Sequence, residues 1–190
     1  MAIIEDCQLG TRYVGGHYQS GRHFISGFIM AGETIRETVE ILESRLAGTP
    51  ARSEVGTVLL CTVQGEIHDI GESIVGIKLR SYGFTVYDLG VDVPAAEVAR
   101  QAVALEPDIV GLWGLLNVAV EGMKATVAEL RLAAPDLGRP VLVIIGGGQI
   151  NEQAREWIGA DLWTNDAARG VRLIREAVAA GRRSRRRSAT

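Results

Sequence analysis

Cysteine and long apolar runs are both scarce in this sequence. Only Cys7 and Cys61 occur among 190 residues, so the chain has neither a CxxC pair nor a disulfide framework. No uninterrupted apolar run reaches the roughly 18 residues that suggest a membrane-spanning helix, and no secretory signal is visible. We therefore predict a cytoplasmic protein.

Positive charge is also scarce, except at the C-terminal end. The net charge is −3, but five arginines fall within the last nine residues, so the rest of the chain carries about −8. The five are Arg182, Arg183, Arg185, Arg186 and Arg187. An acidic body disfavours nucleic-acid binding, so contact with nucleic acid or an acidic partner is expected only of residues 181–190. We predict that this basic tail is disordered.

From residue 56 onward, short β-branched runs alternate with amphipathic stretches. We predict strands at 57–63, 85–90, 108–116, 140–148 and 160–164. We predict helices near 70–82, 94–105, 119–133, 150–158 and 167–180. Several of the strand runs are apolar throughout, as expected when helices cover both faces of a sheet.

This alternation predicts an α/β fold, a flavodoxin-like, doubly wound sheet of five parallel strands in the order 2-1-3-4-5. Ligands of such folds bind beyond the carboxyl ends of the strands, where the strand order reverses. The loops that follow the strands are therefore where functional residues are expected.

The first fifty residues follow a different pattern. Apolar residues recur near a helical period over 27–46, and 13–24 predicts a short helix followed by a turn. Two helices cannot bury a core of their own. We therefore expect a partial helical cap over residues 1–50, packed on an α/β domain of residues 51–180, with 47–56 as the linker.

The first predicted strand runs directly into "QGEIHDIG", residues 64–71, in which acids surround a histidine. His68 could reach over the strand ends, while Glu66 or Asp69 accepts the proton of the ring nitrogen that a metal does not use. After the fourth strand, the glycines at 146–148 would let a flat ligand lie against the backbone.

Each of these features also has a simpler structural explanation. His68 could be an ordinary loop histidine, and the three glycines could form a tight turn. Either acid could instead favour the N-terminus of the helix that follows. Their joint occurrence in consecutive loops is what favours a binding site.

Together these residues resemble those of cobalamin-binding proteins of the corrinoid-protein and methionine-synthase type. That family carries Asp-x-His-x-x-Gly after the first strand, Ser-x-Leu after the third and Gly-Gly after the fourth. The corresponding segments here are Glu66-x-His68-x-x-Gly71, Trp113-x-Leu115 and Gly146-Gly147. The cap text "YQSGRHFISGFIMAGETIRETVEIL" is also similar, and the resemblance covers about residues 13–180.

The resemblance implies bound cobalamin, as methylcobalamin or adenosylcobalamin, with His68 as the lower axial ligand of cobalt and Glu66 hydrogen-bonded to His68. The other implied cofactor-binding residues of the α/β domain are Asp69, Gly71, Trp113, Leu115, Asn117, Gly146, Gly147 and Ala167. From Trp113 onward they would line or adjoin the slot for the nucleotide tail. On the cap, Phe24, Phe28 and Met30 would shield the upper face, where a methyl or adenosyl group is carried.

Departures from the family pattern bear on these expectations. Glu66 replaces an aspartate, but its longer arm can still reach the ring. Trp113 replaces a serine beside the buried tail base, so the indole either stacks on the base or plugs the slot. The cap lacks its first helices, which leaves the upper face less enclosed or completed by a second chain. His17 and His23 are either solvent-facing cap residues or upper-face ligands.

The resemblance implies a corrinoid methyl carrier that presents methylcobalamin to partner methyltransferases, which would perform the catalysis. The alternative is a regulatory sensor, in some relatives light-responsive, in which cobalamin or another tetrapyrrole changes cap packing; Glu66, the short cap and the basic tail favour it. A small mutase subunit is a third candidate, but residues 1–47 argue against it because such subunits generally lack this cap. A homo-oligomer is compatible with each.

Overall fold

The structure is a computed structural model that describes residues 3, 6, 9–10, 13–14, 17, 20, 22, 25–46, 55–137 and 141–188. The chain divides into two compact units, Met1–Pro50 and Ala51–Thr190. No helix among these described residues is long and apolar enough to cross a membrane.

The first unit contains one long helix, α2, which spans Ile25–Leu46 and matches the helix predicted over 27–46. Ile35 is buried on this helix, whereas Met30 is exposed. Before it, the described positions Tyr13 and His17 are helical, and a turn follows at Ser20. Of the expected linker, residues 47–54 lie outside the described residues.

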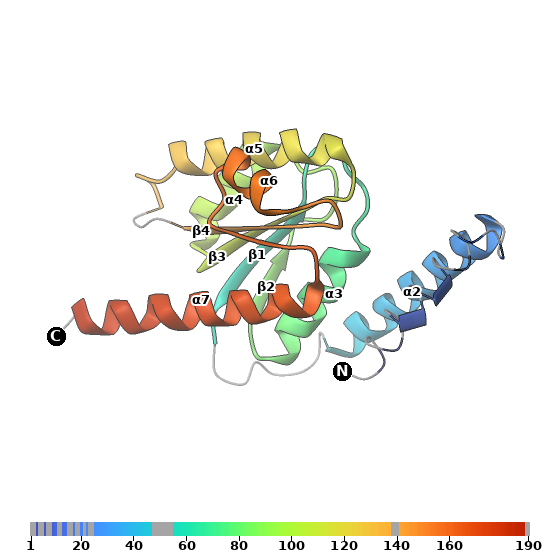
Figure 1. Ribbon diagram of the computed structural model, residues 1–190. Coiled ribbons are helices and arrows are strands. Elements are labelled where there is room, and N and C mark those ends of the chain that lie inside the picture. The colour runs from blue at the N-terminus through green and yellow to red at the C-terminus, as the bar shows by residue number, and fades with distance from the viewer. Residues whose placement is uncertain are drawn as a thin grey trace. The chain divides into compact units, whose positions relative to one another are not determined.

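The second unit is built on a parallel sheet whose strand order, β2-β1-β3-β4-β5, is the one predicted (Figure 1). The strands are β1 (Thr57–Thr62), β2 (Thr85–Asp88), β3 (Ile109–Trp113), β4 (Leu142–Gly146) and β5 (Leu162–Thr164). β1 and β3 form the centre and are buried almost throughout. This burial explains why their sequences are continuously apolar instead of alternating.

Helices cover both faces of this sheet, each over its own apolar core. They are α3 (Ile70–Ser81), α4 (Ala95–Leu105), α5 (Asn117–Leu132), α6 (Glu152–Ile158) and α7 (Ala167–Ser188). One core joins the sheet to α4, α5 and α6, and the other joins it to α3 and α7. Figure 1 shows these two layers on opposite sides of the strands. The doubly wound prediction is thereby confirmed.

The elements end at different residues from those that apolar runs alone indicate. The runs at 108–116 and 140–148 leave the sheet at Trp113 and Gly146, and their last residues form loops. α6 has clearer limits, because the Asn151 side chain accepts a hydrogen bond from the N–H of Ala154 and Gly159 adopts a left-handed conformation.

The C-terminal tail differs from the expectation of disorder. α7 continues through the arginine-rich segment as far as Ser188. Arginine is a good helix former, and positive charge near a helix C-terminus interacts favourably with the helix dipole. The composition that suggested disorder is therefore also compatible with a helical extension.

Candidate functional site

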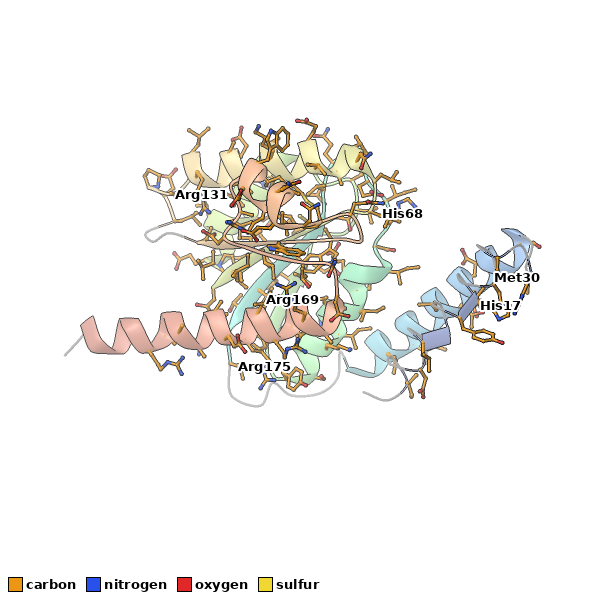
Figure 2. The ribbon with its side chains drawn as sticks, viewed as in Figure 1. His17, Met30, His68, Arg131, Arg169 and Arg175 are labelled. Carbon is orange, nitrogen blue, oxygen red and sulfur yellow. The ribbon has the colours of Figure 1, made fainter. Side chains whose placement is uncertain are left out.

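The candidate site lies at the carboxyl ends of the central strands. β1 pairs with β3 and β3 with β4, so the loops that follow these three strands are neighbours. They carry the histidine motif, the segment 114–116 and the glycines that begin at 146. Figure 2 shows His68 at the edge of the unit, on the loop between β1 and α3.

Glu66 is the most highly connected side chain of these loops. It is 1% exposed. Its Oε1 accepts hydrogen bonds from the N–H groups of Ile67 and His68, at 3.0 and 3.1 Å. Its Oε2 accepts from the N–H groups of Leu115 and Leu116, at 2.9 and 2.7 Å. One carboxylate thus joins the loop after β1 to the loop after β3.

These contacts determine the charge of Glu66. Burial raises the pKa of its carboxyl group, but the hydrogen bonds from Leu116, His68 and Leu115 outweigh that effect. They lower the pKa of Glu66 to about 2. The side chain is therefore an anion throughout the physiological pH range, held inside the protein by donors from two loops.

His68 carries the available metal-binding nitrogen of the site. Its Nδ1 is hydrogen-bonded to Oε1 of Glu66, and its side chain is 49% exposed. An ionised carboxylate can only accept, so Nδ1 must be the protonated nitrogen. In the neutral ring this leaves the lone pair on Nε2, the atom that a metal would bind.

The neighbouring loops support this pair through the backbone. Oδ1 of Asp92 accepts a hydrogen bond of 2.7 Å from the N–H of Gly65, and the N–H of Asp92 donates to the carbonyl of Glu66. Gly65 has a φ of 83°, which glycine adopts without strain. Asp69, a second candidate partner for His68, instead begins α3 as its N-cap, without a side-chain cap hydrogen bond.

The other predicted residues of the α/β unit lie around this centre. Leu115 is 42% exposed, and Asn117 begins α5 on the surface. Gly147 has a φ of 151°, a conformation that favours glycine. Ala167 begins α7 and packs against the core on the α3 face. Gly71 and Gly146 both adjoin Trp113, which is buried at the end of β3.

Apart from Leu115, the exposed apolar side chains of this site were not predicted. Ile67 is 68% exposed, Leu116 49% and Val118 51%. Ile67 and Leu116 belong to the two loops that Glu66 connects, as does Leu115, whereas Val118 lies in the first turn of α5. The apolar run after β3 was the available signal, but it was interpreted as part of the strand.

Sequence reasoning also missed Glu72, a buried acid in the first turn of α3. Its Oε2 accepts a hydrogen bond of 2.5 Å from the hydroxyl of Thr62, whereas Oε1 has no hydrogen-bond partner within the described residues. Burial, followed by the negative charge of Asp88, raises the pKa of Glu72 to about 9. Glu72 is therefore a neutral carboxylic acid at pH 7. The available signal in the sequence was an acidic residue, Glu72, that directly precedes a largely apolar stretch of the predicted helix.

The three cap residues belong to the other unit. Met30 is 71% exposed on α2 (Figure 2). Phe24 and the side chain of Phe28 lie outside the described residues, as does His23. His17 is described, and its ring lies 4.4 Å from that of Tyr13, centroid to centroid.

Comparisons with known proteins agree on one class. Residues 56–172 match the B12 binding domain. Dimethylamine corrinoid protein 1 of Methanosarcina acetivorans is 32% identical over 90% of this chain and 79% of its own. The crystal structure of a cobalamin-binding protein from Desulfitobacterium hafniense is 36% identical, with a TM-score of 0.62, over 90% of this chain and 78% of that chain.

A further solved structure is the methanol:cobalamin methyltransferase complex of Methanosarcina barkeri. The matching chain is 26% identical, with a TM-score of 0.59, over 93% of this chain and 66% of that chain. The shared region thus includes residues of both units.

Proposed function

Because this chain belongs to the B12 binding domain family, we propose that it is a corrinoid carrier that presents methylated cobalt to a partner methyltransferase. The observation that carries the proposal is the Glu66–His68 pair at the carboxyl end of the sheet. A half-exposed imidazole held by a buried carboxylate is suited to ligating a metal that enters from solvent.

The metal-binding side chains of the site fit a cobalt ion that is already bound in a macrocycle. The described residues contain no cluster of three or more histidine, cysteine or carboxylate side chains that could hold a bare ion. A corrin supplies the equatorial nitrogens of its cobalt itself. Such a metal would need only one ligand from the protein, and Nε2 of His68 would provide it. When bound, the cobalt supplies the methyl-transfer chemistry.

Glu66 is a positioning residue in this proposal. Its carboxylate fixes the tautomer of His68 and makes the ligating nitrogen more basic. Because the four backbone N–H groups also fix the carboxylate, the imidazole keeps its orientation without help from the ligand. The exposed side chains of Ile67, Leu115 and Leu116 would contact the apolar edges of the macrocycle.

The first unit has a proposed role on the opposite side of the cofactor. Phe24, Phe28 and Met30 would cover the upper face, and the large exposed area of Met30 on α2 supports this role. Residues 1–50 would then be a partial cap, and residues 51–180 the cofactor-binding domain. The carrier would work in the cytoplasm.

The arginine-rich end of α7 favours a second candidate, a cobalamin-dependent sensor. Of its arginines, Arg183 is exposed and Arg182 lies 3.4 Å from Asp108. A helical basic segment would suit an acidic partner or nucleic acid whose binding responds to the cofactor. Illumination of an adenosylcobalamin complex separates the two functions, because a sensor should change its oligomer size and a carrier should not.

An absorbance titration with hydroxocobalamin tests the carrier proposal. The wild-type protein should give the spectrum of histidine-ligated cobalt, and His68→Ala should abolish it while far-UV circular dichroism stays unchanged. Glu97→Ala, at an exposed ion pair with Arg100 on α4, is the control and should behave like the wild type. A His68→Ala spectrum identical to that of the wild type would refute the ligand assignment.

A further inference from the structure

Trp113 ends the central strand β3 at the floor of the candidate site. In the sheet it pairs with Thr62 on one side and with Gly146 on the other. The residue is 5% exposed and belongs to the core between the sheet, α3 and α7. Its indole therefore lies inside the protein, beside the last residue of β4, instead of projecting into solvent.

Glycines surround the indole closely. A Cβ atom built on Gly146 would lie 2.6 Å from Cζ2 and 2.7 Å from Nε1 of Trp113. A Cβ on Gly111 would lie 2.6 Å from Cζ3, and one on Gly71 would lie 3.6 Å from Cδ1. The ring thus occupies space that side chains on Gly111 and Gly146 would otherwise fill.

These contacts define a cradle for a flat aromatic ring, formed by Gly71, Gly111 and Gly146. The cradle already holds a ring from the chain itself. The indole packs in the same apolar core as Ile144 and Ile174, and the interiors of proteins are close-packed. A second aromatic ring could enter only if Trp113 left the core.

We propose that Trp113 excludes the nucleotide base of a corrinoid from this cradle, so that the chain selects corrinoids without that base. The preferred ligand class is a cobinamide, whose lower tail ends before the nucleotide. This inference rests on the proposed function, because it assumes that His68 binds the cobalt of a corrinoid. It goes beyond that function because it names the class of corrinoid that the protein binds preferentially.

The ligand exchange at cobalt favours the same class. In diaquacobinamide a water molecule holds the lower position, so His68 forms its bond as that water leaves, with no change in oxidation state. In cobalamin the tethered base competes for the same position and must also be accommodated elsewhere. Because Trp113 fills the cradle, the displaced base would have to remain at the surface, without the apolar contacts that a buried slot would provide.

Affinity ratios test the inference. Dissociation constants for diaquacobinamide and hydroxocobalamin are measured by absorbance for the wild type, Trp113→Ser and Trp113→Phe. The wild type should bind the cobinamide at least about tenfold more tightly, a difference of about 1.4 kcal/mol. Trp113→Ser should remove this preference by tightening cobalamin binding, and Trp113→Phe, which retains part of the core volume, should give an intermediate ratio.

Trp157→Ser is the matched control, since this indole is 47% exposed on α6 and lies beneath the ammonium of Lys124. Its ratio should equal that of the wild type. Equal wild-type affinity for the two corrinoids, or a preference that survives in both Trp113 variants, would overturn the inference while leaving the carrier proposal standing. Failure of the wild type to bind either corrinoid would overturn the carrier proposal, and this inference with it.

Discussion

Glu66 and Leu116, which are fifty residues apart in the chain, are joined by a hydrogen bond of 2.7 Å from the Leu116 N–H to Oε2 of the carboxylate. The adjacent N–H of Leu115 binds the same oxygen at 2.9 Å. A single side chain thus holds together the loops that follow the two central strands. Its removal should affect both loops at once.

Replacing Glu66 by alanine should destabilise the protein. The N–H groups of His68, Leu115 and Leu116 would lose a charged acceptor in a buried place, and each unsatisfied donor costs about 1–3 kcal/mol before water enters. We expect a net loss of about 2–4 kcal/mol in the free energy of unfolding, measured with urea. Glu97→Ala, at an exposed pair with Arg100, is the control and should change little. A similar small loss for both variants would mean that Glu66 does not join the loops.

Acid should weaken the protein through Glu66. The pKa of this carboxyl group is about 2 in the folded state and near 4.5 when unperturbed. The unfolded chain therefore binds the proton first, and the stability supplied by ionised Glu66 is complete above pH 4.5 and lost as the pH falls towards 2. Urea midpoints between pH 6 and pH 3 should fall less steeply for Glu66→Gln than for the wild type. Parallel curves would show that Glu66 is not the group responsible.

Glu72 should have the opposite dependence. Its pKa is about 9 in the folded state against 4.5 unperturbed, so the folded protein retains a proton that the unfolded chain releases. Stability should therefore fall as the pH rises through this window, by at most roughly 1.4 kcal/mol per pH unit. Glu72→Gln keeps a neutral side chain of similar shape and should flatten the decline between pH 6 and pH 9. An unchanged slope in this variant would place the proton on another group.

The contact between Trp113 and Gly146 predicts a steric coupling. Gly146→Ala places a methyl group 2.6 Å from Cζ2 of the indole and should cost about 1–3 kcal/mol of unfolding free energy. The same substitution should cost much less in a Trp113→Ser background, because the opposing ring is gone. Gly71→Ala is the matched control: its methyl group would lie 3.6 Å from the indole, an ordinary contact, and should cause no loss. Additive effects of Gly146→Ala and Trp113→Ser would contradict the packing described above.

The fold could be predicted because buried parallel strands are recorded directly in the sequence as short apolar runs. Where these strands end could not, because Leu115 and Leu116 continue the apolar run of β3 although both are exposed. Apolarity does not distinguish a residue buried in a sheet from one exposed beside a binding site. The tail shows the same ambiguity, since arginines suit both a disordered segment and a helix.

Within the candidate site, the side-chain contact that could be predicted joins residues that are close in sequence. Glu66 and His68 are two residues apart, and their types suggest their contact. The donors on Leu115 and Leu116 are backbone groups, which leave no trace in residue identity. Trp113 was recognisable as unusual, but only packing against Gly111 and Gly146 determines where its ring lies. The protonation of Glu72 likewise depends on burial, which the identity of the residue does not reveal.

The bonds that Glu66 makes to two loops also bear on how quickly the site can work. The hydrogen bonds that the Glu66 carboxylate accepts all come from the protein itself. The imidazole of His68 is therefore already oriented before a ligand binds. Little conformational entropy remains to be lost when the metal arrives. Under the proposed function, binding and release of a metal by His68 would then require only a small displacement of one ring.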